Sequence, residues 1–235
     1  MVKLLRRLGR RREPGVALLE GPRVVREAAA TGVELDLLAV REGDRFDLPA
    51  ARSVVLSQRV FNSISQTVTP QGVLAVARVE ERPLVAALSA SRTVGWPLVV
   101  LDGVQDPGNV GTICRTAAAA GAPALAVLSG TADPFGPKAV RASAGNVFRL
   151  LVSRAAAGDL AGLSGYGAAA AGGTALERTP IEDGDLLVLG SEAHGVTPAP
   201  NLQLVTIPLA RGVDSLNVAA AAAVLLFEIR RRKAA

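Results

Sequence analysis

The sequence has 235 residues, of which 49% are hydrophobic and only 3% aromatic, and its formal net charge is +5. This composition indicates a globular protein with a core of Ala, Val and Leu, and it favours helices packed on a buried sheet. The single cysteine, Cys114, and the single histidine, His194, exclude a disulfide framework and a Cys/His zinc cluster, so we expect no metal. With no apolar run long enough to span a bilayer and no secretory signal, we expect a cytoplasmic protein without a membrane partner.

The first residues of the chain are strongly basic. Lys3 and five arginines are opposed only by Glu13 within the first fifteen positions. Arginine forks suit phosphate oxygens, so the segment predicts contact with a polyanionic partner. Charge alone favours equally a solvated basic tail that has no such role.

Residues 18–79 alternate helical and strand patterns and therefore predict a compact α/β module. We expect an amphipathic helix over residues 17–32 and strands over residues 34–40 and 72–80. The next segment, residues 82–96, loses this periodicity and contains Pro, Ser and Gly, which indicates a linker.

The second half of the chain repeats a rhythm of strand and helix. Strands are expected at residues 97–103, 123–130, 149–153, 185–192 and 202–210, and helices at residues 108–121, 137–148 and 216–232. Buried strands that alternate with helices predict a parallel sheet covered on both faces. We therefore divide the chain into a first domain at residues 1–85, a linker at residues 86–96 and a second domain at residues 97–235.

Three loops of the second domain carry polar residues and glycines where predicted strands end, which is where ligands gather in parallel sheets. In the first of these loops, Asn109 can cap the helix that follows, and Arg115 lies six residues later. An arginine that points inward from an Ala-rich helix needs an anion or a polar ligand. A surface arginine is the plainer alternative.

The second loop follows the strand at residues 185–192. It places Glu192 near Gly190 and Gly195, and these glycines allow a ligand to approach the backbone closely. Glu192 is also well placed to pair with Arg115. A tight turn without a ligand is the alternative for this loop taken by itself.

The third loop leads into the last helix and contains Asp214, Ser215 and Asn217. Ser215 is a good helix cap, but one cap needs only one residue. Three polar groups beside the exposed amides of a helix start indicate a ligand pocket or a junction of neighbouring loops.

Together the three loops resemble the three motifs of the SpoU family, also called the TrmH family, of S-adenosylmethionine-dependent RNA ribose 2'-O-methyltransferases. The matching segments are DPGNVGTICRTAAAAG, LVLGSEAHGV and IPLARGVDSLNVAAAAAVLLFE, and PFGPKAVRASAGNVF resembles the segment between the first two motifs. The front segments LLEGPRVVREAAATGVELDLLAV and SQTVTPQGVLAVARV are similar to a substrate-binding domain of many members, which is itself similar to ribosomal protein L30e.

The resemblance implies a C-terminal parallel-sheet methyltransferase domain with a deep trefoil knot, preceded by a smaller L30e-like α/β domain. It also implies S-adenosylmethionine as the cofactor, RNA as the partner and a homodimer formed through the C-terminal domain. We prefer 23S ribosomal RNA as the substrate because the L30e-like domain accompanies many members that modify ribosomal RNA. A tRNA methyltransferase and a non-catalytic RNA-binding or ribosome-assembly protein of the same fold are the alternatives.

The resemblance also implies roles for single residues. Arg115 assists deprotonation of the 2'-hydroxyl or stabilises its charge, Asn109 and Glu192 orient Arg115, and Ser215 and Asn217 hold the site together. The cofactor is expected against Leu189, Gly190, Gly195, Ile207, Leu209 and Leu216. Contacts to RNA are expected from Arg23, from Arg141, for which a structural role is the alternative, and from Arg10, Arg11 and Arg12 of the tail.

Overall fold

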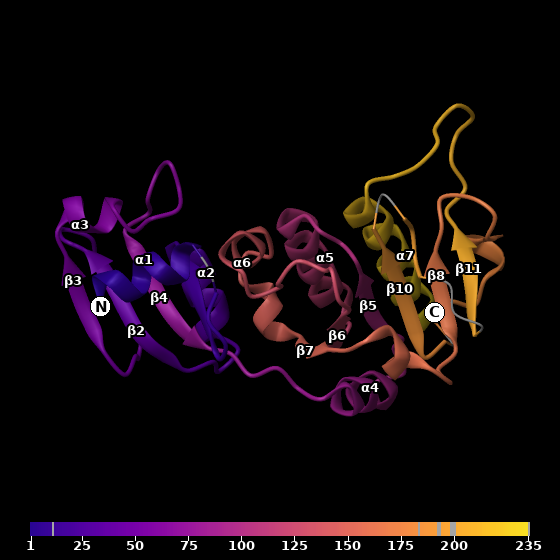
Figure 1. The fold of residues 1–235 in the computed structure, drawn as a ribbon, viewed down its shortest axis with the longest axis horizontal. Helices are drawn as coiled ribbons and strands as arrows, with labels where there is room; N and C mark the ends of the chain where they lie inside the picture. Colours follow the sequence, from indigo (N-terminus) through magenta and orange to yellow (C-terminus); the bar gives the residue numbers. More distant parts are fainter. Residues whose placement is uncertain (11, 183, 192–193, 198–200, 235) are drawn as a thin grey trace.

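The computed structural model describes residues 1–10, 12–182, 184–191, 194–197 and 201–234. These residues form two units side by side, and each unit combines helices with a sheet (Figure 1). The predicted α/β fold class is therefore confirmed.

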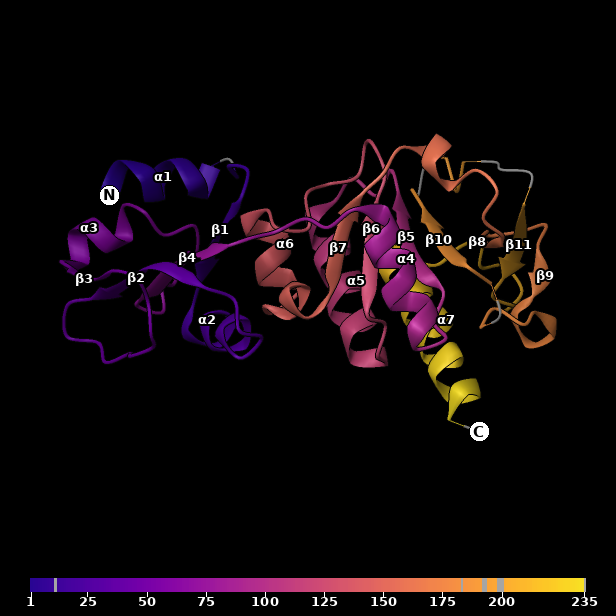
Figure 2. The same ribbon diagram turned by 90° about the horizontal axis from the view of Figure 1, so that it is seen from below.

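The first unit is a four-stranded sheet with helices on both faces. Its elements are α1 (Val2–Arg10), β1 (Val16–Glu20), α2 (Pro22–Ala29), β2 (Leu35–Arg41), β3 (Ser53–Leu56), α3 (Gln58–Asn62) and β4 (Val73–Arg78). The strand order is β1-β4-β2-β3, in which β4 is antiparallel to both neighbours and β3 is parallel to β2. Figure 2 shows α1 and α2 on opposite sides of this sheet.

Helix α1 occupies the segment that was expected to be a basic tail. Leu5 and Leu8, three residues apart on one side of the helix, are 0% and 1% exposed and pack in one apolar cluster with Phe61. The arginines of α1 lie on its exposed side. A solvated tail is therefore wrong for residues 2–10, because burial of the leucines fixes the segment on the sheet.

The helix expected over residues 17–32 is too long at its start. Residues 17–20 belong to strand β1, and α2 begins at Pro22. Proline has no amide hydrogen to donate and suits the first position of a helix, so the strand ends before it. The strands expected around β2 and β4 are confirmed.

The second unit is a seven-stranded sheet in which every pairing is parallel, in the order β7-β6-β5-β10-β8-β11-β9. Its strands are β5 (Leu98–Asp102), β6 (Ala124–Val127), β7 (Leu151–Arg154), β8 (Gly165–Ala168), β9 (Thr174–Ala175), β10 (Leu186–Gly190) and β11 (Leu202–Thr206). Its helices are α4 (Leu84–Thr93), α5 (Pro107–Ala120), α6 (Pro137–Ala142) and α7 (Val218–Lys233), with 3-10 turns η1 (Asn146–Arg149), η2 (Ala157–Leu160) and η3 (Leu176–Arg178).

Helices cover both faces of the larger sheet. Val99 and Leu101 of β5 belong to the apolar cluster that includes α5, α6 and α7. Leu98 and Val100 point to the other face and cluster with Ala87 of α4. The parallel sheet predicted from the sequence is thus buried on both faces, and none of the described helices is long and apolar enough to cross a membrane.

The segment expected to be a linker contains helix α4. Ala87 and Ser91 of this helix are buried, so the segment is packed on the larger sheet. The chain passes from the first unit to the second at residues 79–83, between β4 and α4.

Candidate active site

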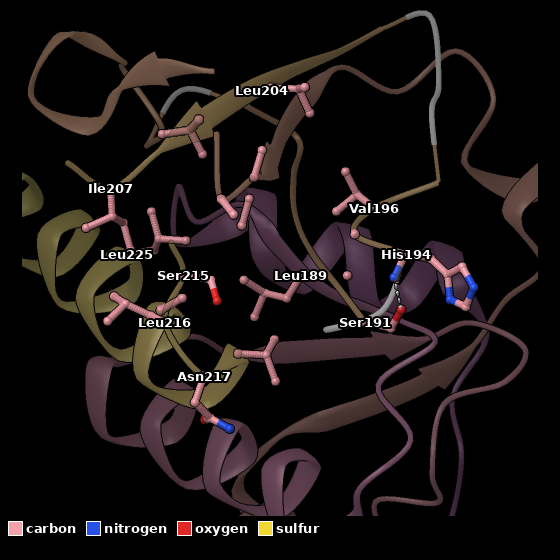
Figure 3. A pocket seen from close by; sticks show the side chains of 18 of the residues that line it. Leu189, Ser191, His194, Val196, Leu204, Ile207, Ser215, Leu216, Asn217 and Leu225 are labelled. Atoms are coloured by element: carbon pink, nitrogen blue, oxygen red, sulfur yellow. Dashed lines mark hydrogen bonds between the residues drawn. The ribbon is translucent and has the colours of Figure 1, made fainter. Parts of the chain in front are cut away.

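A cavity of about 620 Å³ lies where β8, β10 and β11 reach their carboxyl ends. This end of a parallel sheet is where ligands bind, and the volume falls within the roughly 300–1,000 Å³ of small-molecule pockets. Loops from three distant parts of the sequence and the start of α7 form its walls (Figure 3). The sheet topology therefore brings together residues that the sequence separates.

The six residues expected to contact a cofactor all line this cavity, together with Ser215 and Asn217. The six are Leu189, Gly190, Gly195, Ile207, Leu209 and Leu216. The sequence did not single out Val196, Leu204 or residues 168–170, which also line it. Residues 168–170 lie at the end of β8 and just after it, and this place at the end of a parallel strand was a usable signal.

The end of β10 lies tightly against the loop that follows it. Gly195 has a φ of +67°, in the left-handed region, and its amide donates to the carbonyl of Ser191 at 2.9 Å. A Cβ atom on Gly190 would overlap the carbonyl group of Gly195 and the amide of Val196. Only glycine fits at Gly190, so peptide groups as well as apolar side chains line this wall of the cavity.

Asn217, and not Ser215, is the cap of helix α7. Its Oδ1 accepts from the amides of Ala219 at 2.9 Å and Ala220 at 3.4 Å. Its Nδ2 donates to Oδ1 of Asn109 at 3.2 Å. The prediction of Ser215 as the cap is therefore wrong, and Asn217 both starts α7 and joins the third loop to the first.

Asp106, and not Asn109, caps helix α5. Its Oδ1 accepts from the amide of Gly108 at 3.1 Å and from Nζ of Lys138 at 2.6 Å. These hydrogen bonds, that from Lys138 first, hold the pKa of Asp106 below its ordinary value. Because Asp106 caps α5, Asn109 is available for the contact with Asn217.

Arg115 does not point inward as expected. It lies on the exposed side of α5. Arg115 is not among the described residues that line the cavity. Glu192, its expected partner, lies outside the described residues. Of the five residues expected to carry the chemistry, the structure brings Asn109, Ser215 and Asn217 to the cavity and its rim.

The arginines expected to contact RNA fall into two groups. Arg10 and Arg23 are exposed, and Arg11 lies outside the described residues. Arg12 is only 11% exposed and donates to Glu81 and Asp133. The guanidinium of Arg141 lies 3.7 Å from the buried carboxylate of Glu20, which favours the structural role considered for it.

Acidic, cysteine and histidine side chains are scattered through the described part of the chain. No three of them there come together in a group that could hold a metal ion. The polar groups of the cavity are peptide, hydroxyl and amide groups and the imidazole of His194, which suit an organic ligand.

Two family models match the chain, and between them they span both units. The SpoU rRNA Methylase family matches residues 97–227, and the MRM3-like substrate binding domain matches residues 1–75. The chain belongs to the SpoU rRNA methylase family. The SpoU match includes every residue that lines the cavity, so the resemblance predicted from the sequence is confirmed.

Individual members of the SpoU family are similar to the chain over most of its length. The 23S rRNA (guanosine(2553)-2'-O)-methyltransferase RlmP of Bacillus subtilis is 33% identical over 226 residues, which are 91% of this chain and 88% of that protein. A structure of a TrmH-family RNA methyltransferase from Porphyromonas gingivalis is 34% identical, with a TM-score of 0.80 and coverage of 98% of this chain and 97% of that one. An AdoMet-bound rRNA methyltransferase from Sinorhizobium meliloti is 29% identical, with a TM-score of 0.82 and coverage of 98% and 94%.

Proposed function

We propose that this protein transfers a methyl group from S-adenosylmethionine to a ribose 2'-hydroxyl of 23S ribosomal RNA. The observation that carries the proposal is the cavity at the carboxyl ends of β8, β10 and β11 in a member of the SpoU family. The activity named for the relative from Bacillus subtilis supports 23S ribosomal RNA as the substrate. We also propose a cytoplasmic location, where this substrate is found in bacteria.

The residues of the cavity fit S-adenosylmethionine. Leu189, Leu209 and Leu216 offer apolar surface for the adenine ring, and the peptide groups at Gly190 and Gly195 offer hydrogen bonds to its polar edge. When bound, the cofactor supplies an electrophilic methyl group on its sulfonium. The relative from Sinorhizobium meliloti is an AdoMet complex, which supports this assignment.

The proton of the 2'-hydroxyl must leave as the methyl group arrives, so the enzyme positions two substrates and manages one proton. We propose that the proton passes to solvent water. We assign to Arg115 a hydrogen bond to O2' and the stabilisation of its developing negative charge, because a guanidinium stays charged and is a very weak base. Arg115 lies on the exposed side of α5. We therefore propose that it acts in the cavity of a second copy of the chain and not in the cavity of its own copy.

A homodimer through the C-terminal domain is part of the proposal. Val224 and Phe227 project from one side of α7, three residues apart, and are 42% and 48% exposed. Large apolar side chains of this kind mark protein interfaces when they gather on a surface. We also propose the family's trefoil knot, which is supported by the return of α7 onto α5 and β10 after strand β11.

Mixed dimers test both the activity and its arrangement. We expect Arg115→Ala to bind S-adenosylmethionine normally and to lose most methyl transfer. Gly190→Ala binds the cofactor more weakly, so it also loses most methyl transfer when the assay is run at a cofactor concentration near the wild-type Kd. Co-expression of the two variants restores about a quarter of wild-type activity if Arg115 acts across a two-fold dimer, because about half of the dimers are mixed and each has one intact site. Full activity of Arg115→Ala refutes its role, and an inactive mixture refutes action across the dimer.

The substrate is tested with a labelled methyl donor. Fragments of 23S ribosomal RNA and total tRNA are offered in parallel, and the labelled nucleotide is mapped as a 2'-O-methyl ribose. Activity on tRNA alone would show that tRNA, and not 23S ribosomal RNA, is the substrate. RNA binding without methyl transfer to either RNA favours a non-catalytic RNA-binding or ribosome-assembly protein.

A further inference from the structure

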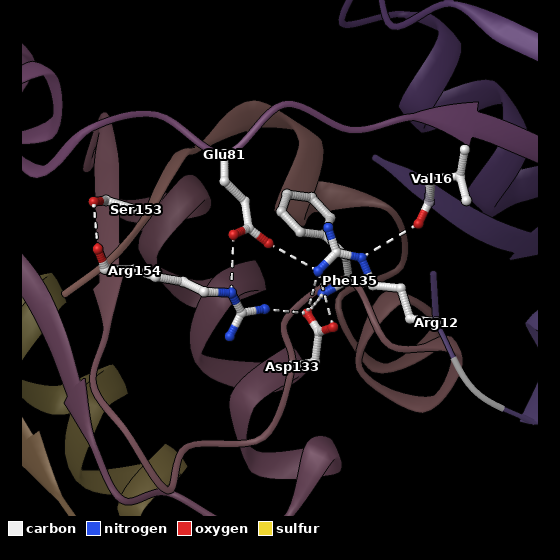
Figure 4. Close-up of polar contacts among 7 residues, drawn as sticks. All are labelled: Arg12, Val16, Glu81, Asp133, Phe135, Ser153 and Arg154. Atoms are coloured by element: carbon white, nitrogen blue, oxygen red, sulfur yellow. Dashed lines mark hydrogen bonds and ion pairs between the residues drawn. The ribbon is translucent and has the colours of Figure 1, made fainter. Parts of the chain in front are cut away.

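Four charged side chains meet where the two units join, and they come from four separate segments of the chain (Figure 4). Arg12 precedes β1 of the first unit, Glu81 lies in the connection between the units, and Asp133 and Arg154 belong to the second unit. Arg12 Nη1 lies 2.8 Å from Glu81 Oε1 and 2.9 Å from Asp133 Oδ2. Arg154 closes the ring, with Nε 2.9 Å from Glu81 Oε2 and Nη2 3.0 Å from Asp133 Oδ1.

The cluster is built around Arg12, which is fixed on every side. Its side chain is 11% exposed, its Nε donates to the carbonyl of Val16 at 3.3 Å, and its guanidinium lies 5.1 Å from the ring centroid of Phe135. Burial alone would raise the pKa of Glu81, but hydrogen bonds from Arg12 and Arg154 outweigh it and hold this pKa below its ordinary value. Glu81 is therefore charged at neutral pH, and charges of opposite sign alternate around the ring.

The connection between the units is itself attached at both ends. The amide of Val79 donates to Gly15 of the first unit at 2.9 Å, and the amide of Arg82 donates to Val152 of β7 at 2.9 Å. Further contacts join the units elsewhere. Nε of Arg149 in η1 donates to Glu27 of α2 at 2.6 Å, and Arg141 of α6 lies 3.7 Å from Glu20 of β1. One contact leaves a rotation free, whereas two separate contacts fix the orientation of one unit on the other.

We propose that the ring of Arg12, Glu81, Asp133 and Arg154 is a latch that sets the orientation of the RNA-binding unit relative to the methyl-transfer cavity. This inference rests on the proposed function, in which RNA held by the first unit must place one ribose at the cavity of the second. The four residues are then positioning residues for the reaction, and Arg12 does not act as the direct RNA contact expected from the sequence.

The two acidic residues distinguish a latch from an RNA contact. A carboxylate repels phosphate, so Glu81→Gln and Asp133→Asn leave RNA binding unchanged or improve it if Arg12 contacts RNA directly. If the ring is a latch, both variants and Arg12→Gln lower kcat about tenfold to a hundredfold, as expected when a substrate is misplaced by a change far from the chemistry. In each variant the Kd values for S-adenosylmethionine and for the RNA fragment stay near those of the wild type.

Arg78→Gln is the matched control. Arg78 also bridges two acidic residues, Glu34 and Asp36, but it does so within the first unit, and its side chain is 62% exposed. We expect wild-type kcat for this variant. Wild-type kcat in both Glu81→Gln and Asp133→Asn overturns the latch, as does an Arg12→Gln variant that acts only by weakening RNA binding.

Small-angle X-ray scattering gives a readout that does not depend on activity. We expect a larger radius of gyration for Arg12→Gln and for Asp133→Asn, with unchanged melting of each unit, and wild-type scattering for Arg78→Gln. Unchanged scattering of folded Asp133→Asn overturns the proposal, even if Arg12→Gln fails to fold. A wild-type protein that methylates no RNA refutes the proposed function instead, and the scattering still reports whether the ring orients the units.

Discussion

Replacement of Asn217 separates its role as a helix cap from its role at the cavity. Asn217→Ala removes the acceptor for the amides of Ala219 and Ala220 and also the contact with Asn109. Loss of the cap costs about 1 kcal/mol, which lowers the melting temperature of a chain of this size by roughly 2–4 °C. Asn217→Ser keeps a capping hydroxyl but is too short to replace Nδ2 toward Asn109, so we expect its melting temperature to stay near that of the wild type.

The assay compares methyl transfer to 23S ribosomal RNA by these two variants at a temperature where both are folded. If the contact between Asn217 and Asn109 positions the loops of the active site, both variants lose activity although only Asn217→Ala loses stability. Melting is followed by circular dichroism and cofactor affinity by calorimetry. Wild-type activity of Asn217→Ser refutes this reasoning, because it would mean that Asn217 acts only as a helix cap.

Three further predictions follow from single side chains. Gly190→Ala displaces the loop at Gly195, and overpacking of this kind costs about 1–3 kcal/mol. We therefore expect calorimetry to show cofactor affinity reduced roughly tenfold to a hundredfold. Gly158→Ala is the control, because a Cβ atom at Gly158 meets no other atom and should leave the affinity unchanged. Burial raises the pKa of Cys114 to about 12, so a thiol reagent at pH 8 labels it only after unfolding. Hydrogen bonds from Arg231 and Arg232 lower the pKa of Glu228 from 4.5 to about 2, so its stabilising effect is complete above pH 4.5 and is lost as the pH falls toward 2. The difference in melting temperature between wild type and Glu228→Gln should shrink over that interval, and a constant difference contradicts the assignment.

The helix caps show how far local sequence can define this site. Ser215 and Asn217 are both good capping residues and lie within one turn of each other, and the same holds for Asp106 and Asn109. Local preference cannot choose between them. The contact between Asn109 and Asn217 decides the matter, and it joins positions 108 residues apart in the chain. The sequence therefore placed both loops at the strand ends correctly but assigned the wrong residue to each cap.

The direction of Arg115 was within reach of the sequence. The buried residues Val110, Ile113, Cys114 and Ala117 of α5 are spaced i, i+3, i+4 and i+7, so they lie on one face of the helix. Arg115 falls outside this spacing and lies on the exposed side. The inward direction was expected from the Ala-rich composition of the helix and not from its periodicity. The cavity could be placed because its glycines and leucines lie at or just after the ends of strands whose parallel pairing the alternating pattern had already indicated.

The basic composition overstates the charge that this protein can offer to RNA. Arg12 and Arg154 are paired with acidic residues in the ring, and Arg149 is paired with Glu27 across the boundary of the two units. Their charges are compensated locally, so they add little to the potential that phosphates meet. We expect the charge that attracts RNA to come instead from exposed arginines such as Arg10 and Arg23. Both belong to the first unit, and in our proposal the orientation of that unit on the cavity therefore decides which ribose is methylated.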